Sequence, residues 1–278
     1  MAEFSRQRPK RAGSFKGAPQ KGRWGGGRAS KESGDGALWL FGLHAVRDAL
    51  LNPRRLKRKL IVTPNALQRL EEAIAEAGVE PEVSDPRKFS APLDPQSVHQ
   101  GAALLTEPLD WGAPEEICAP ADESDAPLAL LLDRVTDPHN VGAVLRSAEV
   151  FGARAVIAPH RHSAPESGAL AKSASGALER QPYLRVQNLA RAMSALQRQG
   201  YVLIGLDGAA PLTLEQAVDA ARGAPLGLVL GAEGPGLREL TRETCDALAK
   251  IPAGADFASL NVSNAAAVAL YAARRRGE

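Results

Sequence analysis

The residues best suited to chemistry in this chain stand in three short segments, each directly after a predicted strand. The first segment runs from Asp133 to Ala148 and contains Asn140 and Arg146. An amide and a guanidinium can bind a phosphate or a ribose hydroxyl and hold it for reaction. Taken alone, they are explained as well by a helix N-cap at Asn140 and a surface cation at Arg146.

The second segment carries a carboxylate within a glycine-rich turn. Glu233 stands between Gly231 and Gly236, after an apolar run. Glycines allow the backbone to come close to a ligand or to another chain segment. A carboxylate among these glycines is either a solvated side chain at the turn or a functional residue. The glycines do not follow the G-x-G-x-x-G order of a dinucleotide fingerprint, which argues against an NAD oxidoreductase.

The third segment, from Ile251 to Asn264, leads from a strand into the last predicted helix. Its polar residues alternate with Leu260 and Val262. A Ser/Asn helix cap explains one or two polar residues at such a place, but not four. The four are Ser259, Asn261, Ser263 and Asn264.

Short apolar runs alternate with helical periodicity over residues 127–278, which predicts a doubly wound, parallel α/β sheet. Ligands of such sheets bind at the carboxyl ends of the strands, where all three segments lie. The predicted strands are Leu128–Asp133, Ala155–Ala158, Val202–Leu206, Leu226–Gly231 and Leu248–Ile251. The predicted helices are Val141–Phe151, Leu189–Gln199, Leu214–Ala221 and Val262–Arg275.

A smaller α/β domain is predicted at residues 37–112. Its helices are expected at Leu40–Leu51 and Ala66–Ala77, and its strands at Lys59–Thr63, Val79–Val83 and Ala102–Thr106. Residues 113–126 contain proline and an acidic excess without periodicity, so we interpret them as a linker.

The positive charge is concentrated in residues 1–36, which hold four Lys and five Arg against three acids, a net charge of +6. The rest of the chain is therefore −4, because the whole chain is +2. Eight glycines and few apolar residues predict a disordered basic tail. Phosphate backbones are the expected partner of such a tail, and a purely solubilising tail is the alternative.

Composition also indicates in which cellular compartment the protein works. The two cysteines, Cys118 and Cys245, form no disulfide framework, and no neighbouring Cys or His suggests a metal site. No apolar run is long enough to span a membrane, and no secretory signal peptide is recognisable. We therefore expect a cytoplasmic protein without a metal and without a membrane partner.

Together and in this order, the three segments resemble the SpoU (TrmH-type) family of RNA ribose 2′-O-methyltransferases. A fourth patch, Lys172–Glu179, is similar to the family's segment between the first two motifs. Phe41–Val46 and His99–Gly101 resemble the ribosomal-protein-like substrate-binding domain of the family's bacterial 23S rRNA guanosine branch. The resemblance covers the whole second domain. One departure is Asn264, where Val is expected in many relatives.

The resemblance implies a trefoil-knotted, parallel-sheet methyltransferase domain that uses S-adenosylmethionine and works as a homodimer on RNA. The implied cofactor contacts are Gly231, Ile251 and Leu260. The implied catalytic residues are Asn140, Arg146, Glu233, Ser259, Asn261 and Ser263. Arg146 is the family's proposed base, but guanidinium groups stay protonated in proteins, so its role as proton acceptor stays open. Glu233 is expected to orient Asn140 or Arg146.

The last predicted helix is unusually rich in alanine, which allows close helix approach. We expect it near the dimer interface, so that a large residue at Ala269 or Ala273 would disrupt assembly or cofactor binding. The alternative is a C-terminal helix buried in a monomer.

Other functions stay open. A non-catalytic RNA-binding or assembly factor of the same fold would not need Asn140, Arg146, Glu233 and Asn261 together. The first domain favours a guanosine of 23S rRNA as the target. A tRNA guanosine, another rRNA site and an antibiotic-resistance methylation are the alternatives.

Overall fold

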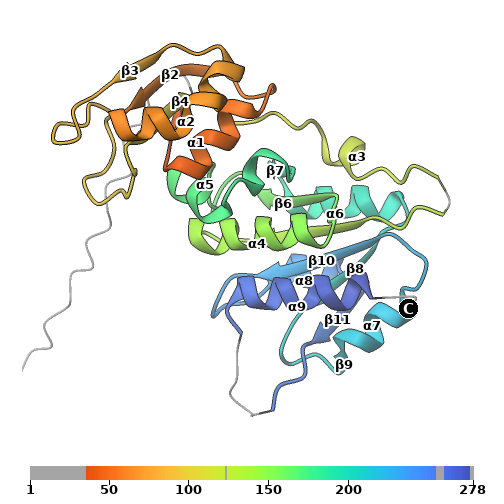
Figure 1. The fold of residues 1–278 in the computed structure, drawn as a ribbon. Helices are drawn as coiled ribbons and strands as arrows, with labels where there is room; N and C mark the ends of the chain where they lie inside the picture. The colour runs from red at the N-terminus through yellow and green to blue at the C-terminus, as the bar shows by residue number, and fades with distance from the viewer. Residues whose placement is uncertain (1–35, 123, 255–259, 276–278) are drawn as a thin grey trace, which may run out of the picture. The chain divides into compact units, whose positions relative to one another are not determined.

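The structure is a computed structural model that describes residues 36–122, 124–254 and 260–275. The predicted basic tail, apart from Gly36, lies outside these ranges, and so does Ser259. The described residues form two sheets, one of four strands and one of seven (Figure 1). No helix of the described part is long and apolar enough to cross a membrane.

The smaller sheet has the strand order β1-β4-β2-β3 and carries two helices. Its elements are β1 (Leu38–Phe41), α1 (Leu43–Leu51), β2 (Lys57–Val62), α2 (Pro64–Ala77), β3 (Pro81–Val83) and β4 (Ala102–Thr106). Thr63 begins α2, because its side chain accepts a hydrogen bond from the Ala66 amide. Gly78 ends the helix in a left-handed conformation, with a φ of 62°. Leu40, Leu60 and Leu104 from the sheet share one core with the buried faces of α1 and α2.

The larger sheet is parallel throughout, with the order β7-β6-β5-β10-β8-β11-β9. Its strands are β5 (Leu128–Asp133), β6 (Ala155–Pro159), β7 (Tyr183–Val186), β8 (Val202–Leu206), β9 (Leu212–Thr213), β10 (Leu226–Gly231) and β11 (Ala247–Lys250). All of β5 is buried, as the uninterrupted apolar run of a central parallel strand requires. Because every strand points the same way, all the loops that follow the strands leave from one edge.

Helices cover both faces of the larger sheet. On one face lie α4 (Pro138–Val150), α5 (Gly168–Ala174), α7 (Leu214–Ala220) and α9 (Val262–Arg274). On the other lie α3 (Pro114–Ile117), α6 (Leu189–Arg198) and α8 (Glu239–Thr244). Figure 1 shows α4 and α9 beside each other over the sheet, and the two helices are in contact.

The sequence predicts the central strands of this domain well. All five predicted strands are confirmed to within one residue at each end, and the sheet is parallel as expected. The edge strands β7 and β9 and the short helices α5 and α8 are absent from the prediction. In residues 113–126, where no regular element is predicted, α3 forms, and Cys118 just after it is fully buried.

The predicted helix Leu40–Leu51 is wrong at its start. Leu38–Phe41 is a strand, β1, which pairs with β4 through contacts such as Leu40 with Leu104. Gly42, with a φ of 94°, separates the strand from α1. A partner more than sixty residues away in sequence decides the conformation of this segment, and local periodicity does not contain that information.

The alanine-rich helix α9 packs several of its small residues inside the chain. Ala269 and Ala273 are fully or almost fully buried in the chain's own core, together with Ala266 and Leu270. A large residue at Ala269 or Ala273 would therefore first disturb the packing inside the subunit, and the dimer expected near this helix stays a prediction. The outward face of α9 instead carries Tyr271 and Val268.

Both cysteines are free thiols. Burial raises the pKa of Cys118 to about 11 and that of Cys245 to about 12. The two thiols therefore stay protonated near neutral pH and are poor nucleophiles.

A buried ion cluster joins the turn after α1 to the second sheet's domain. The guanidinium of Arg55 contacts Glu179 at 2.7 Å and Glu166 at 3.0 Å, and it donates to the Glu107 carbonyl at 2.6 Å. Burial lowers the pKa of Arg55, but the contacts with Glu179 and Glu166 outweigh this and raise it. Asn52 adds a hydrogen bond to Glu179 at 2.9 Å. One cation thus pairs with two carboxylates that are almost fully buried.

We predict that Arg55→Ala destabilises the protein by about 3–5 kcal/mol, because it leaves two buried carboxylates without their cation. Urea unfolding of the two proteins measures the difference. Arg69→Ala, at an exposed arginine of α2, is the matched control and should change stability by no more than about 0.5 kcal/mol. A loss below about 1 kcal/mol for Arg55→Ala would mean that the cluster is a minor contact.

Candidate functional site

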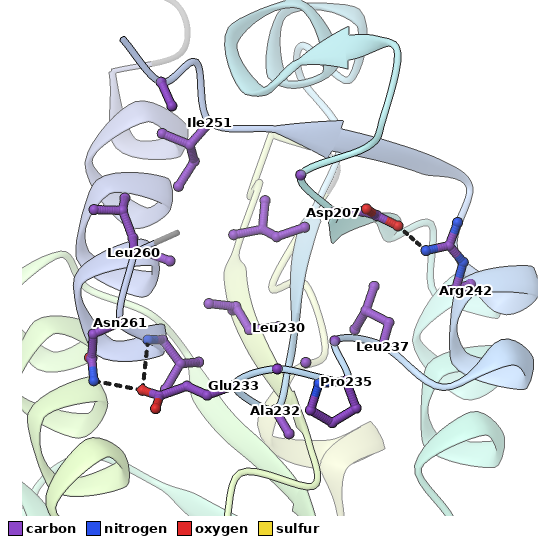
Figure 2. Close-up of a pocket in the computed structure, with 18 of the residues that line it drawn as sticks. Asp207, Leu230, Ala232, Glu233, Pro235, Leu237, Arg242, Ile251, Leu260 and Asn261 are labelled. Carbon is purple, nitrogen blue, oxygen red and sulfur yellow. Dashed lines mark hydrogen bonds and ion pairs between the residues drawn. The ribbon is translucent and has the colours of Figure 1, made fainter. Parts of the chain in front are cut away.

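The carboxyl ends of β8, β10 and β11 border a cavity of about 850 Å³ (Figure 2). A cavity of this size is in the range of small-molecule sites. Apolar side chains form much of its wall: Leu206, Leu230, Leu237, Ile251, Leu260 and Val262. Figure 2 shows Ile251 and Leu260 on one side and Leu237 on the other. The three residues predicted as cofactor contacts, Gly231, Ile251 and Leu260, all line this cavity.

The loop after β10 folds back onto the strand it leaves. The Gly236 amide donates to the Ala232 carbonyl at 3.0 Å, and the two residues form an isolated antiparallel bridge. A Cβ at position 231 would overlap the backbone of Gly236 and the amide of Leu237. Only glycine at position 231 therefore allows the loop to close, and the closed loop forms one wall of the cavity.

Glu233 connects three segments that are far apart in the sequence. Its Oε1 atom accepts hydrogen bonds from Asn261 Nδ2 at 2.7 Å, from Asn140 Nδ2 at 3.1 Å and from the Val262 amide at 3.4 Å. Asn261 Nδ2 also donates to Asn140 Oδ1 at 2.9 Å. The three side chains form a closed polar triangle at the rim of the cavity.

Asn261 has a second role at the start of α9. Its Oδ1 atom accepts from the Ser263 amide at 2.8 Å and from the Ser263 hydroxyl at 2.6 Å, so Asn261 is the N-cap of the helix. The same amide group thus fixes the helix start with its oxygen and binds Glu233 with its nitrogen. Asn264, the departure from the family pattern, is exposed on the first turn.

The sequence predicts Asn140 as the N-cap of α4, and this prediction is wrong. The cap is Asp137, whose side chain accepts from the His139 amide at 3.0 Å, and Pro138 occupies the first helical position. Pro favours that position because its fixed φ suits the helix and its missing N–H is not needed there. The helix starts three residues earlier than predicted, which leaves the Asn140 side chain to bind Glu233.

Arg146 is the predicted residue that the structure leaves apart. It lies six residues after Asn140, about 120° around the helix axis from it, and it is exposed. Its guanidinium forms no hydrogen bond or ion pair with any described residue, and Glu233 does not contact it. The structure therefore brings together Asn140, Glu233, Asn261 and Ser263, but not Arg146, while Ser259 lies outside the described residues.

The sequence reading misses one ion pair in the cavity wall. Asp207, just after β8, pairs with Arg242 of α8, and both side chains line the cavity opposite Leu260 (Figure 2). The signal was available, since Asp207 follows a predicted strand at the same edge as the three motifs. Among the described residues, no group of three or more His, Cys, Asp and Glu side chains could hold a metal ion.

These features define a class of protein: an α/β enzyme with a small-molecule cavity at the carboxyl edge and a polar triangle beside it, joined to a second small domain. The model of the SpoU rRNA Methylase family matches residues 127–271. The model described as RNA 2'-O ribose methyltransferase substrate binding matches residues 39–111. The chain belongs to the SpoU rRNA methylase family, whose members are S-adenosylmethionine-dependent RNA 2′-O-ribose methyltransferases.

Curated relatives and solved structures agree with this assignment. The chain is 40% identical over 244 residues to the 23S rRNA (guanosine-2'-O-)-methyltransferase RlmB of Pectobacterium atrosepticum, covering 86% of this chain and 98% of the relative. It is 39% identical over 242 residues to the Escherichia coli K12 protein of the same name, covering 85% and 98%. The crystal structure of the SpoU methyltransferase AviRb from Streptomyces viridochromogenes with AdoMet is 25% identical, with a TM-score of 0.71, covering 86% and 90%.

We predict that Gly231→Ala destabilises the protein by about 3 kcal/mol or more, because the atoms that a methyl group would meet are backbone and cannot rotate away. Gly208→Ala is the matched control on the same cavity wall, since a Cβ there meets nothing within 4 Å. It should stay within about 0.5 kcal/mol of wild type. Thermal or urea unfolding compares the three proteins, and equal effects of the two substitutions would contradict the close crossing at Gly231.

Proposed function

We propose that this protein transfers a methyl group from S-adenosylmethionine to the ribose 2′-hydroxyl of a guanosine in 23S rRNA. The observation that carries the proposal is the triangle of Asn140, Glu233 and Asn261 at the rim of an apolar cavity. The names of the 23S rRNA guanosine methyltransferases, matched over almost their whole length, support the target.

The cavity suits the proposed cofactor. Ile251, Leu260 and the glycine-rich loop around Gly231 offer flat apolar walls and backbone groups for an adenine. The ion pair of Asp207 and Arg242 offers one group of each charge for an amino-acid end that carries both charges. When bound, S-adenosylmethionine supplies an electrophilic methyl group on a sulfonium sulfur.

The chain's own residues then have to align the hydroxyl and receive its proton. Glu233 Oε1 is occupied by three N–H donors, whereas Glu233 Oε2 has no partner among the described residues. We assign Asn140 and Asn261 to fixing this carboxylate, and Glu233 Oε2 to a hydrogen bond with the substrate. Ser263 supports Asn261, and Ser259 completes the loop in this proposal.

Arg146 fits this scheme as a group that reaches the site of a second subunit. Val150 lies four residues after Arg146 on the same face of α4 and is 77% exposed. Next to it, Phe151 meets the ring of Tyr271 on α9, which is 53% exposed. Exposed apolar patches of this kind often form protein interfaces, so we infer a homodimer through α4 and α9. In this dimer Arg146 reaches the cavity of the partner subunit. There it binds the target phosphate or ribose.

The remaining parts of the chain have supporting roles in this proposal. Residues 37–112 bind the rRNA, residues 113–126 link the domains, and residues 127–278 form the methyltransferase domain. The basic residues 1–36 add a sequence-independent attraction to phosphates. The trefoil knot that the family resemblance implies, where the second and third motifs pass each other, is part of this proposal. Free Cys118 and Cys245 support a cytoplasmic location.

We predict that Arg146→Ala lowers turnover by about a hundredfold or more, without weakening the binding of S-adenosylmethionine, since Arg146 does not line the cavity. Incorporation of tritiated methyl groups into unmodified 23S rRNA and tRNA transcripts measures turnover and tests the target. Calorimetry measures cofactor affinity. Arg198→Ala, an exposed arginine at the end of another helix, should retain activity.

A mixing experiment tests where Arg146 acts. Subunits with Arg146→Ala and subunits with Glu233→Gln should regain activity when they are unfolded and refolded together, because one composite site of the mixed dimer is intact. Turnover of Arg146→Ala within tenfold of wild type would remove Arg146 from the reaction. Methylation of tRNA and not of the 23S transcript would show that the substrate is tRNA, and the proposed 23S rRNA target would be wrong.

We predict that Val268→Glu yields a monomer, because it places a charge in the apolar face of α9 that we assign to the interface. Light scattering distinguishes the 29.3 kDa monomer from the dimer. Val98→Glu, at a 59% exposed valine outside the methyltransferase domain, should leave the mass unchanged. A monomeric wild type with full methylation activity at micromolar concentration would refute the dimer.

A further inference from the structure

Four exposed basic side chains stand at the sheet edge that also carries the cavity. Arg134 follows β5, and His160, Arg161 and His162 follow β6. We call these four residues the basic ledge. None of their side chains forms a hydrogen bond or an ion pair with another residue in the part of the chain that the structure describes. The catalytic site proposed above makes no use of them.

The backbone beneath the basic ledge is held firmly. The His160 amide donates to the Val186 carbonyl of β7 at 2.7 Å, and the Ala164 amide donates to the Val135 carbonyl at 3.2 Å. The Tyr183 hydroxyl donates to the Ala164 carbonyl at 2.7 Å. Three hydrogen bonds therefore tie the two loops to each other and to β7, while the basic side chains remain exposed. Loops fixed in this way are common carriers of binding residues.

Two of the four residues adopt a backbone conformation that side chains disfavour. Arg134 has a φ of 63° and His162 a φ of 60°. The left-handed region costs a non-glycine residue about 1 kcal/mol or more. Glycine would fit both positions better, so stability alone does not explain a basic side chain at either of them.

The charge of the basic ledge is largely uncompensated. The nearest acids in sequence are occupied elsewhere: Asp133 by Arg238, at 2.7 Å, and Glu166 by Arg55. Asp137 caps α4 and is the one acid between Arg134 and Asn140. In a chain that is −4 outside residues 1–36, this is a local positive patch.

The position of the basic ledge relative to the cavity follows from the strand order. In the order β6-β5-β10, the end of β5 adjoins the end of β10, and the end of β6 is one strand further. Neighbouring strands lie about 4.8 Å apart, so the basic ledge begins about 5 Å and extends to about 10 Å from the strand that ends at Gly231, two residues before Glu233. If the ribose of one nucleotide lies at the polar triangle, the phosphates of the neighbouring nucleotides lie along this edge of the sheet.

We propose that the basic ledge binds the RNA backbone next to the target nucleotide, with Arg134 and Arg161 on phosphates and the two imidazoles on phosphate or on unstacked bases. This inference rests on the proposed function for the identity of the RNA. Arginine and histidine suit both tasks, because they donate to phosphate and also stack on bases that are turned out of a loop. The basic ledge thereby sets which nucleotide of the bound RNA faces the cavity.

The test removes two charges from the basic ledge with Arg134→Gln and Arg161→Gln in one protein. Binding of an unmodified 23S rRNA transcript is measured at several salt concentrations. The slope of log K against log salt should become shallower by about 1.4, since each lost single-strand phosphate contact is worth about 0.7. The KM for RNA should rise, and the affinity for S-adenosylmethionine should stay unchanged.

The matched control is Arg198→Gln with Arg222→Gln, two exposed arginines at the opposite, amino edge of the same sheet. The control removes the same charge and should keep the wild-type KM. Equal slopes and KM values for the control and the basic-ledge variant would overturn the proposal. If the wild type binds the transcript but does not methylate it, the proposed target is wrong. The difference in salt slope between the two variants still tests whether the basic ledge binds RNA.

Arg134→Gly separates binding from stability. Glycine accepts a φ of 63° without strain, so the melting temperature should not fall. The KM for RNA should rise as it does for Arg134→Gln. A normal KM with a changed melting temperature would assign Arg134 to the fold alone and overturn its part in the basic ledge.

Discussion

The carboxylate of Glu233 is the interaction on which the arrangement of the site depends. Its Oε1 atom accepts from Asn140, Asn261 and the Val262 amide, and so joins the starts of α4 and α9 to the loop after β10. Val141 and Val262, next to the two asparagines, are buried in the common core, whereas the Glu233 and Asn261 side chains themselves are exposed. The charged acceptor adds to this packing, since hydrogen bonds to a charged group are stronger than those between neutral groups.

The loop that presents Glu233 depends in turn on a steric constraint. At Gly231 the backbone of the strand and the backbone of residues 236 and 237 pass so closely that no side chain fits between them. The position of Glu233 is therefore set by main-chain contact, before any polar bond forms. Both constraints meet in three glycines and one acid within six residues, which explains why this short segment is the most informative in the chain.

The sequence predicts some of these features and not others, for physical reasons. The central strands are long apolar runs, so composition reveals them, whereas β7 and β9 lie at the edges of the sheet and lack that signature. The grouping of Asn140 with Glu233 and Asn261 was expected only from the family resemblance. Its geometry depends on Asp137 as the helix cap, and Pro138 at the first helical position distinguishes Asp137 from Asn140 where cap propensity alone does not. The exposure of Arg146, away from the triangle, is likewise a tertiary property.

Electrostatics links the remaining features. Apart from the basic first 36 residues, the chain has an excess of acids, so its described part does not attract RNA as a whole. Several of those acids form ion pairs within the chain, among them Glu166 and Glu179 with Arg55 and Asp133 with Arg238. Exposed cations without partners therefore count for more than the net charge suggests. Arg146 on α4 and the basic ledge at the sheet edge are such cations. In the proposed dimer, an RNA held by the basic ledge of one subunit meets Arg146 of the partner subunit. Both then act on the ribose that lies close to Asn140 and the carboxylate that Asn140 helps to hold.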